Sequence, residues 1–279
     1  MICNFLVSRR MEPAELIAGL ADAAQVPAGQ VDVCHEDGDM DHRDWGAPVL
    51  CTYHCLRGDV AMSLDIQVRS AAGTAGAPGT EAELALAFAV RTGTGVLYPD
   101  DRIDPETYWL ADRTGTVTRA RLLATDEERP VYRVDAVESA VSAFPGAEVT
   151  PLAEILRSQP VPTPVADALG SDSPAAVSLH IWERLGQRMR GDWAPSGRYL
   201  PELYAQDLAA RDAFEKQVAE VGREERTLLL HAVAELDGIF RAHTVDDAGA
   251  AAALPSAGPH GDGWWWRRVP RSLPWPTVK

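Results

Sequence analysis

The sequence predicts an α+β protein: an N-terminal mixed or antiparallel sheet with helices on one face, followed by a C-terminal all-α three-helix domain. Short segments of alternating apolar residues mark residues 1–157, whereas apolar residues recur at helical spacing over residues 176–245. A Pro/Ser-rich segment over residues 158–175 separates the two patterns, as an interdomain linker does. We expect a flexible tether over residues 246–263 and a Trp-rich basic tail over residues 264–279.

Two helices are expected in the first domain. Residues 12–24 contain an early proline and place Leu16 and Leu20 on one face, which is typical of a helix start. A second helix should begin at Thr80, because Glu83 three residues later completes a capping box.

Strands are expected where apolar and polar side chains alternate. Residues 60–68 show this alternation from Met62 onward, and residues 49–56 precede them through the turn Arg57-Gly58-Asp59. These two segments should therefore form an antiparallel hairpin. The other expected strands cover residues 4–8, 31–35, 95–98, 108–111, 117–123 and 131–137.

Three amphipathic helices are expected in the second domain. Apolar side chains recur every four residues from Val177 to Met189. A second helix should begin at Pro201 and end at Gly222, and a third apolar stripe covers residues 223–244. Three such helices joined by short loops predict a bundle.

Charge and composition restrict the function classes. The chain has 279 residues and a formal net charge of −15, and residues 1–150 alone carry 24 acidic and 12 basic side chains. Nonspecific nucleic-acid binding by the globular body is not expected, because it requires Lys and Arg to neutralise phosphates. Residues 251–279 carry four basic residues and one acidic residue, so only the tail favours an anionic surface.

Hydropathy, the order of charged residues near residue 10 and the bias toward arginine indicate the cellular compartment and the source of the protein. No apolar run approaches the roughly 20 residues that a membrane-spanning helix needs. The basic residues Arg9 and Arg10 follow a short apolar run rather than precede it, which is not the order of a signal peptide. Arginine supplies 24 of the 26 basic residues, a bias typical of GC-rich bacterial genomes. We therefore expect a cytoplasmic bacterial protein.

The Cys and His residues of the first domain are candidates for a zinc site or a cysteine nucleophile. Cys51 and Cys55 would share one face of a strand but lie roughly 13 Å apart at about 3.3 Å per residue, too far for one ion. His54 and Cys55 would point to opposite faces. The sequence therefore favours buried thiols and predicts no metal and no cofactor. The candidates are Cys34, His35, His42, Cys51, His54 and Cys55.

Two acidic segments resemble functional loops. Asp37-Gly-Asp39-Met-Asp41 imitates the start of a calcium loop, but Pro48 stands where a bidentate Glu is required and His42 where a glycine is required. We expect a solvated acidic connection there. Residues 99–106 gather four carboxylates suited to acid/base or divalent-metal chemistry, or to an exposed turn.

Nucleotide-binding motifs are not found, and the histidines of the second domain are weak metal candidates. Gly93-Thr-Gly95 lacks the third glycine of a dinucleotide fingerprint, and no Walker loop or nucleophile elbow occurs. His180 lies on one predicted helix, and His231 and His243 lie on another, without a Glu-x-x-His pair.

The tail is the most distinctive segment, because indoles are costly to leave in water. An internal latch, a docking segment for a protein partner, a membrane anchor and a base-stacking segment all satisfy this need. The candidate partner-binding residues are Trp264, Trp265, Trp266, Arg267, Arg268 and Trp275.

These observations favour a protein-binding module of the immunity or adaptor type, which uses an acidic surface and the Trp/Arg tail to bind a partner, possibly a basic one. The alternative is an enzyme with an interdomain site built from the acidic loop 99–106 and a histidine at 35, 42 or 54. The sequence gives no oligomeric state.

Overall fold

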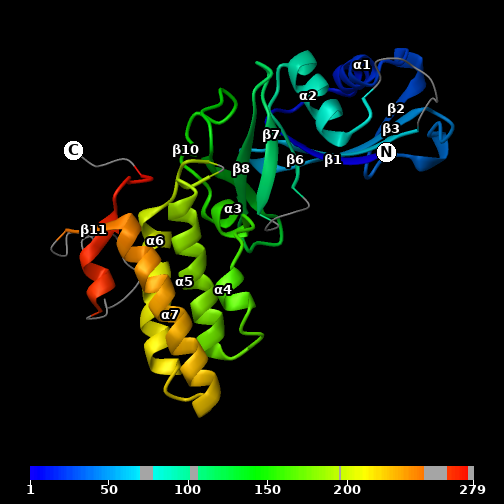
Figure 1. The fold of residues 1–279 in the computed structure, drawn as a ribbon. Coiled ribbons are helices and arrows are strands. Elements are labelled where there is room, and N and C mark those ends of the chain that lie inside the picture. The colour runs from blue at the N-terminus through cyan, green and yellow to red at the C-terminus, as the bar shows by residue number, and fades with distance from the viewer. Residues whose placement is uncertain (70–77, 101–105, 195, 248–262, 276–279) are drawn as a thin grey trace. The chain divides into compact units, whose positions relative to one another are not determined.

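The chain folds into two compact units, Met1–Ile155 and Leu156–Lys279 (Figure 1). The computed structural model shows mixed α/β content, with a ten-stranded mixed sheet and seven α-helices in the part that it describes. Much of the expected tether over 246–263 and of the acidic loop 99–106 lies outside this part. The described residues are 1–69, 78–100, 106–194, 196–247 and 263–275.

The first unit is built on the ten-stranded sheet, which runs in the order β10-β9-β8-β7-β6-β1-β5-β3-β2, with β4 paired to β9. Every strand expected from alternation in this unit is present, with ends that differ by at most two residues. The strands are β1 (Ile2–Val7), β2 (Val31–His35), β3 (Val49–Cys55), β4 (Arg57–Gly58), β5 (Met62–Val68), β6 (Val96–Pro99), β7 (Thr107–Ala111), β8 (Val117–Ala124), β9 (Val131–Val137) and β10 (Glu148–Val149).

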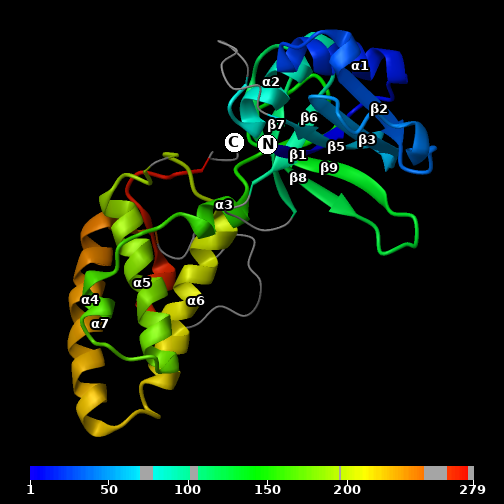
Figure 2. The same ribbon diagram turned by 90° about the vertical axis from the view of Figure 1, so that its right-hand side faces the viewer.

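Helices α1 (Pro13–Ala24) and α2 (Glu81–Thr92) cover one face of the sheet over β1, β5 and β3 (Figures 1 and 2). The capping box expected at Thr80 is confirmed: the Glu83 amide donates to Thr80 Oγ1 at 3.2 Å, and the Thr80 amide donates to the Glu83 carboxylate at 3.2 Å. The apolar faces of α1 and α2 pack against alternate strand residues such as Phe5, Leu64 and Cys51 in one core.

The expected hairpin is confirmed, because β3 and β5 pair antiparallel from Val49 opposite Val68 to Cys55 opposite Met62. The intervening turn differs from expectation, since Arg57 and Gly58 form β4 and pair with β9. Gly58 has φ of +108°, and a Cβ there would lie 2.0 Å from the Tyr132 carbonyl oxygen, so only glycine fits. β2 and β3 pair parallel, which makes the sheet mixed.

A second core lies on the opposite face of the sheet, under β6, β7, β8 and β9. Leu97, Leu110 and Val134 meet Val141 and Phe144 there, from the segment that follows β9. Within the described residues of the first unit, no helix covers the face of β1, β5, β3 and β2 that points away from α1 and α2.

The second unit centres on three helices, α5 (Pro174–Arg190), α6 (Pro201–Gln217) and α7 (Arg223–His243), which lie side by side (Figure 2). Trp182 is buried between them, and its Nε1 donates to Asp237 Oδ1 at 3.0 Å. Arg211 forms a buried ion pair with Asp237 at 3.0 Å. Three helices were expected here, but the unit also contains α4 (Pro164–Asp167) and a ribbon of β11 (Thr244–Asp246) and β12 (Arg268–Pro270). Helix α3 (Ala153–Ser158) crosses the boundary between the two units.

Two details of the expected helices are wrong. Val177 was placed on the apolar stripe of α5 but is 52% exposed, whereas Leu179 and Trp182 are buried. A four-residue repeat advances about 40° per step around a helix of 3.6 residues per turn, so the stripe drifts off the buried face. Gly222 does not end α6, which stops at Gln217; it is the N-cap residue of α7.

Candidate functional site

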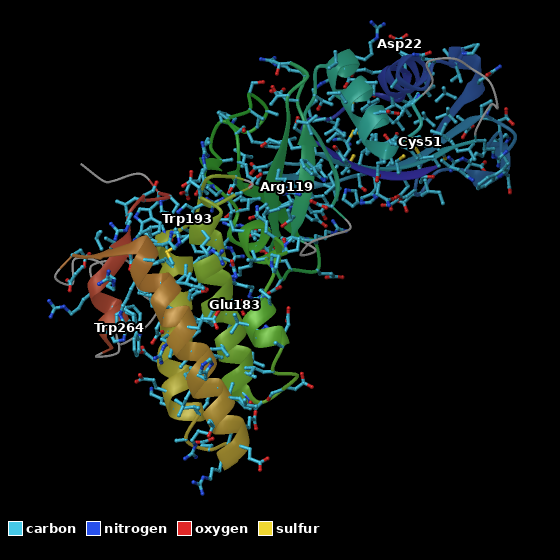
Figure 3. All side chains as sticks on the ribbon, in the orientation of Figure 1. Asp22, Cys51, Arg119, Glu183, Trp193 and Trp264 are labelled. Carbon is cyan, nitrogen blue, oxygen red and sulfur yellow. The ribbon has the colours of Figure 1, made fainter. Side chains whose placement is uncertain are left out.

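The Cys and His candidates of the first unit do not assemble into a metal site. Cys51 lies in the core beneath α1 (Figure 3), and burial raises the pKa of its thiol to about 12. Cys55 is exposed, and its sulfur accepts a hydrogen bond from Arg10 at 3.0 Å. His54 faces the Glu36 carboxylate at 3.4 Å. Among the residues that the structure describes, no group of three or more His, Cys, Asp or Glu side chains is placed to hold a metal ion.

The acidic loop 99–106 is described only at its ends, since residues 101–105 lie outside the described part. Asp100 is buried, and its carboxylate lies 3.2 Å from Arg119 Nε. The Arg119 guanidinium also stacks over the Trp109 ring at 4.4 Å. Asp100 therefore neutralises a cation of the sheet, which is a structural role.

The histidines of the second unit have separate surroundings. His180 Nδ1 lies 3.0 Å from Thr163 Oγ1 and 3.6 Å from Asp167. His231 is exposed and His243 is half-buried at the end of α7.

The Trp-rich tail packs on its own unit. Trp265 and Trp266 are 2% and 6% exposed, and their Nε1 atoms donate to the two carboxylate oxygens of Asp212 at 3.0 and 2.8 Å. The Arg211 guanidinium stacks on the Trp265 ring at 4.4 Å. In this arrangement Trp265 and Trp266 present almost no surface to a partner.

The rest of the tail is partly accessible. Trp264 is half-buried (Figure 3), with the Arg241 guanidinium 3.7 Å from its ring centroid. The Arg268 side chain donates to Thr244, and its carbonyl accepts from Tyr204, whose ring also packs on half-buried Trp275. Arg267 is exposed. Partner binding by the tail residues stays a prediction.

The open face of the first unit's sheet carries a groove of about 370 Å³. Strand alternation builds it, because residues of β1, β3 and β5 that point away from α1 and α2 form its floor. Its exposed apolar side chains are Ile2, 74% exposed, and Trp45, 55% exposed. The residues that line it are Ile2, Asn4, Arg43, Trp45, Leu50, Thr52, Asp65, Ile66 and Gln67.

Arg43 fixes one wall of this groove. Its side chain is 4% exposed and lies 2.9 Å from the Asp32 carboxylate, while its Nη1 donates to Thr52 Oγ1 at 2.7 Å. The guanidinium stacks on Trp45 with 5.0 Å to the ring centroid. Anchored to two strands in this way, Arg43 holds the Trp45 indole beside the sheet while leaving much of the ring exposed.

The segment between β2 and β3, which supplies Arg43 and Trp45 to this wall, is rich in carboxylates. Carboxylates also order this segment: Asp39 accepts from the Asp41 amide at 2.9 Å, and Asp32 of β2 accepts from the Asp44 amide at 3.1 Å. Arg43 is the one Lys or Arg residue in the sequence between β2 and β3. Residues 36–45 form what we call the acidic rim, whose exposed carboxylates are Glu36, Asp37, Asp39, Asp41 and Asp44.

Sequence reasoning found the carboxylates of the rim but missed the groove. Trp45 directly follows Asp44, and an aromatic side chain inside an acidic connection is the signal that was available. A second signal was the polar set Ser63, Asp65 and Gln67 on β5, which marks a face without an apolar cover.

Comparison with protein-family models, with curated proteins and with solved structures gives no significant match. In the described part of the chain, the helices are too short or too polar to cross a bilayer.

Proposed function

We propose that the protein is a protein-binding module of the adaptor or immunity type, and that its first unit binds a partner with a basic surface through the sheet-face groove and the acidic rim. The exposed Trp45, which stacks on Arg43 in a segment with five exposed carboxylates, is the observation that carries this proposal. Tryptophan is enriched at the energetic centres of protein interfaces.

Charge identifies the partner's chemistry. The acidic rim has five carboxylates against Arg43, and residues 1–150 carry a formal charge of −12. A surface of this sign speeds the encounter with a basic protein and repels acidic ones. The exposed Arg267 and the half-buried Trp264 and Trp275 of the tail are a second contact surface within the same proposal.

The enzyme alternative, with loop 99–106 and a histidine, has less support. Asp100 is paired with Arg119, and His54 faces Glu36, so each already has a structural partner. No observation on the described residues favours this second function.

The test uses the tagged full chain to isolate a complex from extract of its own cells, followed by titration with the purified partner. Trp45→Ala should weaken binding at least tenfold, about 1.4 kcal/mol. Leu228→Ala, an exposed apolar residue of α7, is the matched control and should bind like the parent. Absence of a saturable complex, or equal binding by both variants, would overturn the proposal.

Charge is tested separately. The double variant Asp37→Asn/Asp41→Asn should slow association and flatten its dependence on salt, because rim charges act mainly on the on-rate. Asp126→Asn/Glu128→Gln makes the same change in net charge at exposed positions between β8 and β9. If both double variants slow association equally, only net charge matters and the rim is not the contact surface.

A further inference from the structure

A second pocket lies in the helical unit and is lined by cations. It encloses about 330 Å³, within the usual range for small-molecule sites. Three arginines and one carboxylate line it, which gives a formal charge of +2. The lining residues are Arg157, Ile181, Arg184, Arg188, Tyr199, Leu203, Gln206 and Asp207.

Arg188 is the buried member of this set. It is 7% exposed, and its Nη2 donates to the Leu156 carbonyl at 2.9 Å while its guanidinium stacks on Tyr199 at 5.3 Å. Its Nε is buried and makes no hydrogen bond to any described residue. A buried donor of this kind requires an acceptor, because leaving it without one costs about 1–3 kcal/mol.

Arg184 and Arg157 add two more cations. Arg184 lies one turn before Arg188 on α5, where like charges at this spacing repel. Arg157 on α3 donates to Gln206. Within the part of the chain that the structure describes, none of these three guanidinium groups forms an ion pair with a carboxylate.

Asp207 balances the arginines only in part. It is 9% exposed and accepts a hydrogen bond from the Tyr199 hydroxyl at 2.7 Å. Burial raises the pKa of Asp207 to about 6, against the opposing effects of the Tyr199 hydrogen bond and of Arg188, Arg184 and Arg157. The Asp207 carboxylate is thus still largely ionised at pH 7. It offsets one of the three arginine charges, so the pocket keeps a net charge of about +2.

The turn between α5 and α6 holds the Tyr199 ring in place. Trp193 stacks on that ring at 5.1 Å and is 4% exposed. Asp192 and Trp193 both have positive φ, of 50° and 60°, a region that side chains other than glycine rarely occupy. Backbone strain of this kind persists where surrounding packing enforces it and is concentrated at ligand sites.

We propose that this pocket binds a small molecule with a phosphate monoester group. The dianion would face the guanidinium groups of Arg184 and Arg188, which supply the forked donors that phosphate oxygens match. Ile181 and Leu203 give its organic part an apolar wall. The site lies wholly within the second unit and is independent of the sheet-face groove.

The test is calorimetric titration of the full chain with phenyl phosphate and, separately, with benzoate. Phenyl phosphate should bind the parent and bind Arg184→Gln at least tenfold more weakly, while Arg190→Gln, exposed on the same helix outside the pocket, binds like the parent. Equal melting temperatures of the two variants show that both fold. Equal binding by both variants, no binding to the parent, or benzoate binding as tightly as phenyl phosphate would overturn the proposal.

A pH titration gives a second readout. Inorganic sulfate keeps its charge between pH 5.5 and 7.5, so a change in its affinity reports on the pocket. Its binding should tighten as the pH falls through about 6, because protonated Asp207 no longer competes for the arginines that face it, Arg157, Arg184 and Arg188. Asp207→Asn should bind tightly at both pH values. A pH response that persists in Asp207→Asn would contradict this placement of the anion.

Discussion

Removal of the Asp212 carboxylate should loosen the tail from the helical unit. Asp212 is the common acceptor for the buried indole N–H groups of Trp265 and Trp266. Each buried donor left without a partner costs about 1–3 kcal/mol. Since Asp212 is itself half-buried, water would reach part of the vacated space, and we expect Asp212→Ala to lower the free energy of unfolding by roughly 2–3 kcal/mol. Asp212→Asn retains one acceptor oxygen and should lose about half as much.

Urea unfolding followed by tryptophan fluorescence measures this change, because six of the eight tryptophans lie in the second unit. Glu215→Ala is the matched control on the same helix. Its ion pair with Arg211 at 3.3 Å is half exposed, and its removal should cost only about 0.3–0.5 kcal/mol. If Asp212→Ala and Glu215→Ala unfold at the same urea concentration, the tail does not depend on Asp212 and the reasoning is refuted.

Three further predictions concern the backbone, the thiols and pH. Gly58→Ala should lower the free energy of unfolding by roughly 3 kcal/mol or more, because its Cβ would meet the Tyr132 backbone. Gly115 also has positive φ but open space around it, so Gly115→Ala should cost roughly 1–2 kcal/mol. Similar urea midpoints for the two variants would contradict this. At pH 8, iodoacetamide should modify Cys55 and spare Cys51, whose pKa burial raises to about 12, and peptide mass spectrometry that finds equal labelling would disprove it. The raised pKa of Asp207, about 6, means that the folded protein binds this proton more tightly than the unfolded chain does. The free energy of unfolding should therefore fall by about 2 kcal/mol between pH 4 and pH 7, and Asp207→Asn should lack that part of the decrease. Parallel pH profiles of the two proteins would rule this out.

Local signals predicted the elements of the fold well. The capping box at Thr80 and the alternation over 60–68 act within a few residues, so they can be read directly from the chain. The parallel pairing of β2 with β3, and of β4 with β9, depends on contacts far apart in sequence that no local pattern encodes. The ribbon of β11 and β12 was missed for the same reason.

The candidate sites were harder to predict than the elements. The arginine pocket draws its residues from α3, α5, α6 and the turn before α6, so only the Arg184 and Arg188 pair, one helical turn apart, was visible in the sequence. The tail shows the reverse case. Its four tryptophans were conspicuous, but whether they pack internally depends on Asp212, which lies more than fifty residues earlier.

The position of β2 at the border of the sheet has a consequence for self-association. An edge strand such as β2 has one row of backbone amide and carbonyl groups that can pair with a strand of another molecule, and such pairing commonly initiates aggregation. The exposed carboxylates that follow this strand put charge near the edge that a second strand would have to approach. The carboxylates that we propose as the contact for a cationic protein would thus also keep copies of this chain apart.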